Sequence, residues 1–136
     1  MPERPLPQAR GEEKAFFADA RAEHRLPYYR CTSCQRLYSR PHERCTACGS
    51  TAVGRLWSTG SGTVYSLTEV HRAGHPWFAD QVPYTVAIVD LDEGFRCLAD
   101  LVLPPYAEPA FIGQRVTAQF EDISDALALV HFMGQS

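Results

Sequence analysis

The chain has 136 residues, of which 45% are hydrophobic and 21% charged, and its formal net charge is −3. This balance is typical of a folded globular protein, because a disordered chain is poorer in apolar residues and richer in charge. The length allows one domain with a hydrophobic core, or a small domain with a metal-stapled appendage. It excludes two large domains.

The N-terminal segment MPERPLPQARGEEK has three prolines and mixed charges but no apolar core, so it does not resemble a secretory signal or a membrane anchor. No other stretch reaches the roughly eighteen apolar residues that a membrane helix needs. Four of the five cysteines form two Cys-x-x-Cys pairs. An odd number of cysteines in a reducing compartment favours metal binding over disulfides, and we expect a cytoplasmic protein.

The N-terminal third is expected to contain one short helix. Residues 1–13 are expected to form a flexible tail, and residues 14–23 (KAFFADARAE) a helix, because this segment lacks Pro and Gly and is rich in helix formers. A ten-residue helix is marginal on its own in water. We therefore expect it to dock on the rest of the chain, with docking on a partner as the alternative.

The remainder of the chain is predicted to be mainly β. Short β segments are expected at residues 28–30 and 36–38, around the cysteine pairs. A long strand, with room for a bulge, is expected within WSTGSGTVYSLTEVHR, and four more are expected at residues 83–91, 95–103, 115–123 and 127–133. Five strands with a long connection after the third favour a Greek-key barrel of the oligonucleotide/oligosaccharide-binding (OB) type, whereas a sandwich usually has about seven strands.

These patterns divide the chain into three parts. We predict a tail and helix at residues 1–26, a cysteine-rich ribbon at 27–54 and an OB-fold domain at 55–136. Charge is distributed unevenly: residues 30–55 carry five arginines and one glutamate, whereas residues 56–136 carry three arginines and ten carboxylates. A nucleic-acid-binding protein would normally place basic residues along its main docking surface, so nucleic acid is not the favoured partner.

The cysteine-rich segment, CTSCQRLYSRPHERCTACGS, predicts a metal site. Each Cys-x-x-Cys turn places two thiolates on one side of a tight knuckle, and two facing knuckles give the four sulfurs that tetrahedral Zn²⁺ accepts. The predicted ligands are Cys31, Cys34, Cys45 and Cys48. Iron would use the same ligands, and a redox dithiol is the rival hypothesis, although the α/β context that it needs is missing.

Four thiolates fill the coordination sphere of zinc, whereas a catalytic zinc keeps one position open. The predicted site is therefore structural, and His42, between the knuckles, is interpreted as a solvated loop residue. His71 and His75 are interpreted as loop histidines, and Cys97 as a small buried hydrophobic residue. The hairpin carboxylates at positions 90, 92 and 93 are interpreted as turn-formers and solvated charge.

The order of these features is similar to that of the DUF35 family, in which a short helix, a rubredoxin-like zinc ribbon and an OB-fold follow one another. The blocks WSTGSGTVYSLTEVHR, PYTVAIVDLDEG, ADLV and IGQRVTAQFED each resemble a family block, in the family's order. The resemblance covers about residues 14–134 and departs from the family pattern at Gln35, where Gly is usual, and at Asp100, where Asn is frequent.

The resemblance implies a non-catalytic accessory subunit that supports an acyl-CoA-processing enzyme (thiolase-like, retro-aldolase or hydratase) and helps to form its acyl-CoA site. It implies the same four cysteine ligands and no catalytic residue. Expected partner or ligand contacts are Arg30, Arg36, Arg40 and Arg44, with the aromatic residues Phe16, Phe17, Tyr28, Tyr29, Tyr38 and Trp77. The alternatives are a single-stranded nucleic-acid-binding module and a stand-alone hydrolase.

Overall fold

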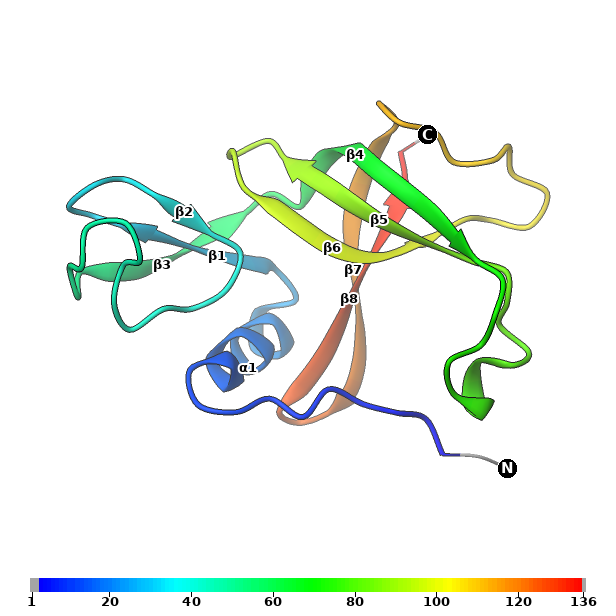
Figure 1. Cartoon of the computed structure of the whole chain (residues 1–136), viewed down its shortest axis with the longest axis horizontal. Helices are drawn as coiled ribbons and strands as arrows, with labels where there is room; N and C mark the ends of the chain where they lie inside the picture. Colours follow the sequence, from blue (N-terminus) through cyan, green and yellow to red (C-terminus); the bar gives the residue numbers. More distant parts are fainter. Residues whose placement is uncertain (1–2, 136) are drawn as a thin grey trace.

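The computed structural model describes residues 3–135 and consists mainly of β-strands, arranged as a small sheet beside a barrel (Figure 1). The helices are α1 (Glu13–Glu23) and the short 3-10 helix η1 (Pro76–Phe78). The strands are β1 (Leu26–Cys31), β2 (Leu37–Tyr38), β3 (Val53–Ser58), β4 (Ser61–Val70), β5 (Tyr84–Leu91), β6 (Arg96–Val102), β7 (Arg115–Ser124) and β8 (Leu127–Gly134).

The small sheet is the ribbon, with antiparallel strands in the order β2-β1-β3. Its register pairs Tyr29 of β1 with Tyr38 on one side and with Arg55 on the other. The sequence pattern predicts β1 and β2 but not β3. Because β3 runs to Ser58, the sheet extends past the predicted end of the ribbon at residue 54.

The other five strands close into a barrel in the order β4-β5-β6-β8-β7, which confirms the predicted five-stranded OB-type barrel. All neighbouring strands are antiparallel except β6 and β8, which run parallel. The register of β4 against β5 shifts between Val64 and Ser66, at a bulge of the kind that helps a long strand to bend around a barrel. Val89, Val116 and Phe132 are completely buried in its core.

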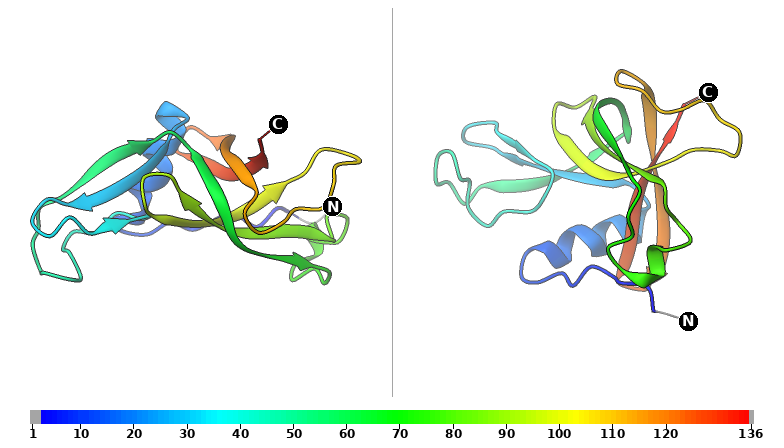
Figure 2. Two further views of the ribbon diagram at one scale, coloured as in Figure 1. Left: turned by 90° about the horizontal axis from the view of Figure 1, so that it is seen from above. Right: turned by 45° about the vertical axis from the view of Figure 1, so that its right-hand side comes forward.

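Helix α1 docks on the chain itself, as predicted, and lies between the ribbon and the end of the β7–β8 hairpin (Figure 2). Phe16 and Ala20, one turn apart, face inward and are buried. The last turn is fixed to the hairpin because Arg21 donates to the Ser124 carbonyl and His24 Nε2 lies 2.8 Å from Asp122. No helix in the described part of the chain combines the length and apolar character that crossing a bilayer requires.

The β5–β6 hairpin holds the opposite face of the ribbon. The ring of Phe95 stacks on Tyr28 of β1, with 4.7 Å between centroids and 8° between planes. The carboxylate of Glu93 accepts hydrogen bonds from the Ser58 hydroxyl (2.6 Å) and the Thr59 backbone N–H (2.9 Å), where the chain leaves the ribbon. The interpretation of Glu93 as solvated charge was therefore wrong, because this carboxylate fixes the junction between the two parts.

Candidate metal centre and its surroundings

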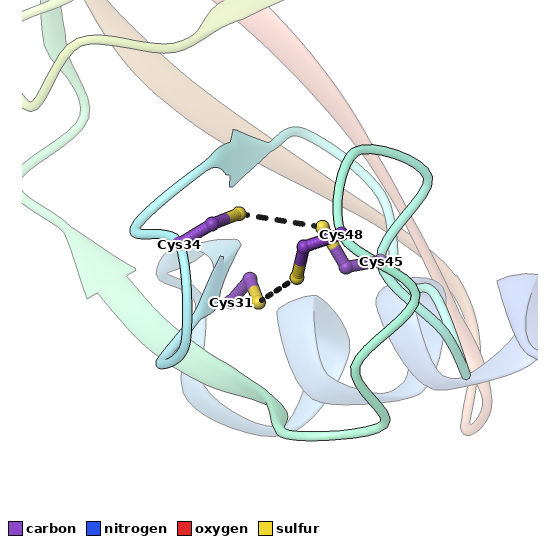
Figure 3. Close-up of side chains that lie close together, drawn as sticks. All are labelled: Cys31, Cys34, Cys45 and Cys48. Atoms are coloured by element: carbon purple, nitrogen blue, oxygen red, sulfur yellow. Dashed lines mark hydrogen bonds between the residues drawn. The ribbon is translucent and has the colours of Figure 1, made fainter.

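The four predicted ligands meet at the tip of the ribbon (Figure 3). Their Sγ atoms all lie within 4.8 Å of one another, with 3.6 Å between Cys31 and Cys48 and 3.5 Å between Cys34 and Cys45. With Zn–S bonds of about 2.3 Å, a tetrahedral centre holds its sulfurs about 3.8 Å apart. The spacing of the donors therefore fits a tetrahedral metal ion.

Each knuckle is a tight turn closed by a backbone hydrogen bond. The N–H of Gln35 donates to the Cys31 carbonyl at 2.7 Å, and the N–H of Gly49 donates to the Cys45 carbonyl at 2.9 Å. Gln35 and Gly49 both have left-handed backbone angles, with φ of 67° and 78°. Such angles favour glycine. Gln35 adopts this conformation all the same, and its side-chain amide donates to the Thr32 carbonyl at 3.0 Å.

Tyr38 supports the second knuckle. Its hydroxyl lies 3.2 Å from Cys45 Sγ and accepts a hydrogen bond from the Thr46 backbone N–H at 3.0 Å. The Tyr38 hydroxyl can therefore donate to the sulfur, and this contact lowers the pKa of Cys45 to about 6. Cys45 is consequently disposed to bind a metal as a thiolate near neutral pH.

The four thiols cannot all ionise together without a counterion. The backbone N–H of Ser50 lowers the pKa of Cys48, but the neighbouring cysteine sulfurs and desolvation together outweigh it and raise that pKa to about 11. A divalent cation would remove this repulsion and stabilise all four thiolates. The chemistry of the donor set thus fits a metal ion. Within residues 3–135 the cluster contains only cysteines, and His42 instead packs on the Tyr38 ring and bonds to the Arg40 carbonyl.

Changing Tyr38 to phenylalanine is expected to weaken zinc binding by about 10- to 100-fold, because the variant loses the hydrogen bond that orients and stabilises the Cys45 thiolate. The fold should survive, since the ring keeps its packing. Competition with a chromophoric chelator measures the affinity. Tyr106→Phe removes a hydroxyl from a fully exposed ring and serves as the control. Equal affinities for the two variants would contradict the role given to Tyr38.

Three of the predicted aromatic contacts belong to the chain's own core. Phe16, Tyr29 and Tyr38 are 9%, 5% and 8% exposed. Because these rings are covered by α1 and the ribbon itself, they offer no free face to a partner in this conformation. Phe17 and Tyr28 are half-buried. The periodicity of the sequence shows which residues are apolar, but not which face becomes covered when α1 docks.

The predicted arginines lie on the exposed surface of the ribbon. Arg44 donates to the Gly49 carbonyl at 2.8 Å and so closes the second knuckle, while Arg40 lies 4.0 Å from Glu13. Arg36 lies over the ring of Tyr38. Neither Arg30 nor Arg36 has an ion-pair partner within the described residues. Part of the positive charge of the ribbon therefore remains available to an anionic ligand or partner.

A cavity of about 640 Å³, the junction cavity, opens where α1, the ribbon loop and the barrel meet. Phe17 and Arg40 line one side, and strand β6 supplies Arg96, Cys97 and Leu98 on the other. Leu98 is 67% exposed. An apolar residue in a strand is normally expected to face the core, so the sequence does not predict this exposure. Cys97 is half-buried, and burial raises the pKa of its thiol to about 11. The sequence was interpreted as placing Cys97 in the core, but this residue is only half-buried and lines the cavity.

Trp77 does not join the other predicted contacts. It lies in η1, on the part of the barrel remote from the four cysteines, where the Arg4 guanidinium stacks 4.7 Å from its ring centroid. His75 precedes this helix and accepts the Trp77 backbone N–H through Nδ1 at 3.1 Å. This hydrogen bond gives His75 a structural role in the loop.

A four-sulfur ribbon joined to a closed five-stranded barrel defines a protein of the zinc-ribbon and OB-fold class. Residues 18–54 match the family described as "ChsH2, rubredoxin-like zinc ribbon domain", and residues 58–121 match "ChsH2, C-terminal OB-fold domain". The chain belongs to the DUF35 family.

Three relatives illustrate the similarity. A "DUF35 domain-containing scaffold protein" of Methanocaldococcus jannaschii is 34% identical over 71% of this chain and 67% of its own length. A "Probable enoyl-CoA hydratase alpha subunit" of Thermomonospora curvata is 38% identical over 73% of this chain, which spans only 30% of that protein. The solved structure "Ltp2-ChsH2(DUF35) aldolase" contains a chain with 33% identity and a TM-score of 0.76, covering 96% of this chain and 98% of that one.

Proposed function

We propose that the chain is a non-catalytic accessory subunit of an acyl-CoA-processing enzyme of the aldolase, hydratase or thiolase-like class. The observation that carries the proposal is the likeness, along almost the whole of both chains, to the DUF35 chain of the solved aldolase. The hydratase alpha subunit and the scaffold protein add support, since one is named for an acyl-CoA reaction and the other for assembly.

The metal in this proposal is one Zn²⁺ ion, held by the four cysteines of the ribbon. Zinc bound by four protein thiolates has no position left for water or substrate, so it would stabilise the ribbon without taking part in a reaction. The consequence for function is indirect. The ion would fix the knuckles that carry Arg36 and Arg44, and so would set the shape of the basic surface.

The junction cavity is the place where this chain would help to form an acyl-CoA site. Its wall is apolar at Phe17, Leu98 and Val130, which suits an acyl or pantetheine chain. Arg40, which lies 4.0 Å from Glu13, is at the same cavity and can meet phosphate groups or partner carboxylates, whereas Arg96 beside it is paired with Asp90 at 2.6 Å. All three parts of the fold contribute to this cavity, so its shape depends on how rigidly they are joined.

Co-expression with the proteins encoded beside its gene tests the accessory role. A tagged chain is expected to retain an aldolase, hydratase or thiolase-like subunit through size-exclusion chromatography. The partner's turnover of acyl-CoA should fall when the chain is omitted, and the chain alone should give none. Turnover by the purified chain alone would support a stand-alone enzyme, and failure to retain such a subunit would overturn the proposal.

Charge reversal tests the basic surface of the ribbon. The double variant Arg30→Glu/Arg36→Glu is expected to weaken the complex by about tenfold or more, because it places carboxylates where two arginines stand that have no ion pair among residues 3–135. Arg72→Glu, an exposed reversal on a barrel loop, gives the matched control. Titration calorimetry compares the three dissociation constants. The same constant for the double variant and the wild type would exclude the ribbon arginines from the interface.

A further inference from the structure

The N-terminal arm, residues 3–10, reaches across the molecule to the far side of the barrel. It runs beneath α1 and the β7–β8 hairpin and ends near η1 (Figures 1 and 2). Arg4 is its anchor. Nη1 and Nη2 of Arg4 donate to the two carboxylate oxygens of Glu121 at 2.7 and 3.1 Å, and the guanidinium stacks on Trp77.

The pocket that receives Arg4 has the chemistry of a guanidinium site. Arg4 itself lines a cavity of about 710 Å³ there, together with the aromatic rings of Trp77, Phe78 and Tyr84. Glu121 of β7 supplies a carboxylate that takes both guanidinium nitrogens. A flat cation between an aromatic face and a bidentate carboxylate is the arrangement that favours arginine over lysine.

The receiving carboxylate is itself held in place. His131 of β8 lies with Nε2 2.9 Å from Glu121 Oε1 and Nδ1 3.6 Å from Asp100 Oδ2. The His131 side chain is 17% exposed, so these neighbours confine it. The contacts with Arg4 and then His131 lower the pKa of Glu121 to about 2, which keeps it ionised at any physiological pH. The His131 contact comes from the barrel itself, so Glu121 keeps one of its two partners when the arm leaves.

The arm, by contrast, has few other attachments. Within the described chain, the hydrogen bonds made by residues 3–9 all come from the Arg4 side chain. The arm forms no regular element, and most of its residues are exposed. Ordering such a segment costs conformational entropy that one side chain offsets only in part. A docked arm held in this way can be exchanged for another ligand with the same head group.

We propose that the pocket between Trp77 and Glu121 is an arginine-binding site, which Arg4 occupies in the free chain and from which an arginine of a partner protein displaces the N-terminal arm. The charge favours this occupant, because Glu121 and Asp100 line the pocket and, among residues 3–135, His131 is the one basic side chain that lines it with them once Arg4 leaves. The site goes beyond the proposed accessory function and does not depend on which enzyme the chain supports.

Nuclear magnetic resonance of the full chain, with N-acetyl-L-arginine amide as the probe, tests the site. In Arg4→Ala the Trp77 indole N–H is expected to shift saturably, and its assignment follows from Trp77→Phe. In the wild type the apparent dissociation constant of the probe should be about tenfold higher. The docked arm blocks the site, and a site that is free in about a tenth of the molecules binds a ligand about tenfold more weakly. The same constant in both proteins, or no saturable shift in Arg4→Ala, overturns the proposal.

Two controls separate the site from a general charge effect. Arg10→Ala removes an exposed arginine of the same arm that has no ion pair within the described residues, and it should titrate like the wild type. Adding Glu121→Gln to Arg4→Ala should abolish binding while the amide spectrum stays that of a folded barrel. Binding that persists without the carboxylate would overturn the assignment. N-acetyl-L-lysine amide should bind detectably more weakly than the arginine probe.

Discussion

Replacing Cys45 with serine is expected to remove bound zinc and unfold the ribbon. The change deletes the most buried of the second pair of sulfurs, which is 2% exposed and bonded to the Tyr38 hydroxyl. Structural Zn²⁺ contributes about 10–16 kcal/mol to the folding of small zinc-binding units, far more than the small ribbon sheet can supply by packing. Elemental analysis measures the metal content. The amide resonances in a nuclear magnetic resonance spectrum show which strands lose the chemical-shift dispersion of a folded structure.

The barrel is expected to remain folded in that variant. Its core residues lie on strands that pair with one another, and the barrel closes without any strand of the ribbon. Cys97→Ser is the matched control, because Cys97 is the one cysteine outside the metal-binding cluster. This variant should retain a stoichiometric amount of zinc, and the amide resonances of its ribbon should stay dispersed. A Cys45→Ser protein that still binds zinc stoichiometrically, or that keeps its ribbon after chelation, would contradict the metal centre.

The ribbon tip and the barrel strands could be predicted because their signals are local. Two Cys-x-x-Cys turns bring their own sulfurs together within four residues, and strands such as β5 are short runs rich in β-branched and apolar residues, bounded by turn residues. Strand β3 was missed because VGRLWS contains Gly and Arg and shows no alternation. Its pairing with β1, which lies more than twenty residues earlier, makes it a strand.

Contacts between distant segments could not be predicted in the same way. Glu93 has the sequence context of an ordinary hairpin carboxylate, yet it bonds to Ser58 and Thr59 because the barrel turns that hairpin toward the ribbon. Arg4 and Glu121 are 117 positions apart and meet only after the barrel has closed. For the same reason, sequence alone could not distinguish buried Phe16 from half-buried Phe17.

Replacing Phe95 with alanine is expected to destabilise the chain by about 3–5 kcal/mol and to loosen the ribbon on the barrel. Phe95 is 5% exposed and stacks on Tyr28, so the change removes a buried ring and the aromatic pair that joins the two parts. Urea unfolding measures the loss of free energy. Phe111→Ala makes the same chemical change at a ring that is 58% exposed, and it should cost less than about 0.5 kcal/mol.

The variants Phe95→Ala and Phe111→Ala also test whether the partner enzyme depends on a rigid junction between the ribbon and the barrel. The junction cavity takes its walls from α1, the ribbon loop and β6, so its shape persists only while the ribbon is fixed to the barrel. If that cavity contributes to an acyl-CoA site, Phe95→Ala should reduce the turnover of the partner enzyme under conditions where the variant is still folded. Phe111→Ala should leave this turnover unchanged. Full turnover with a destabilised but folded Phe95→Ala chain would show that a rigid junction is not needed, and would limit the accessory role to assembly.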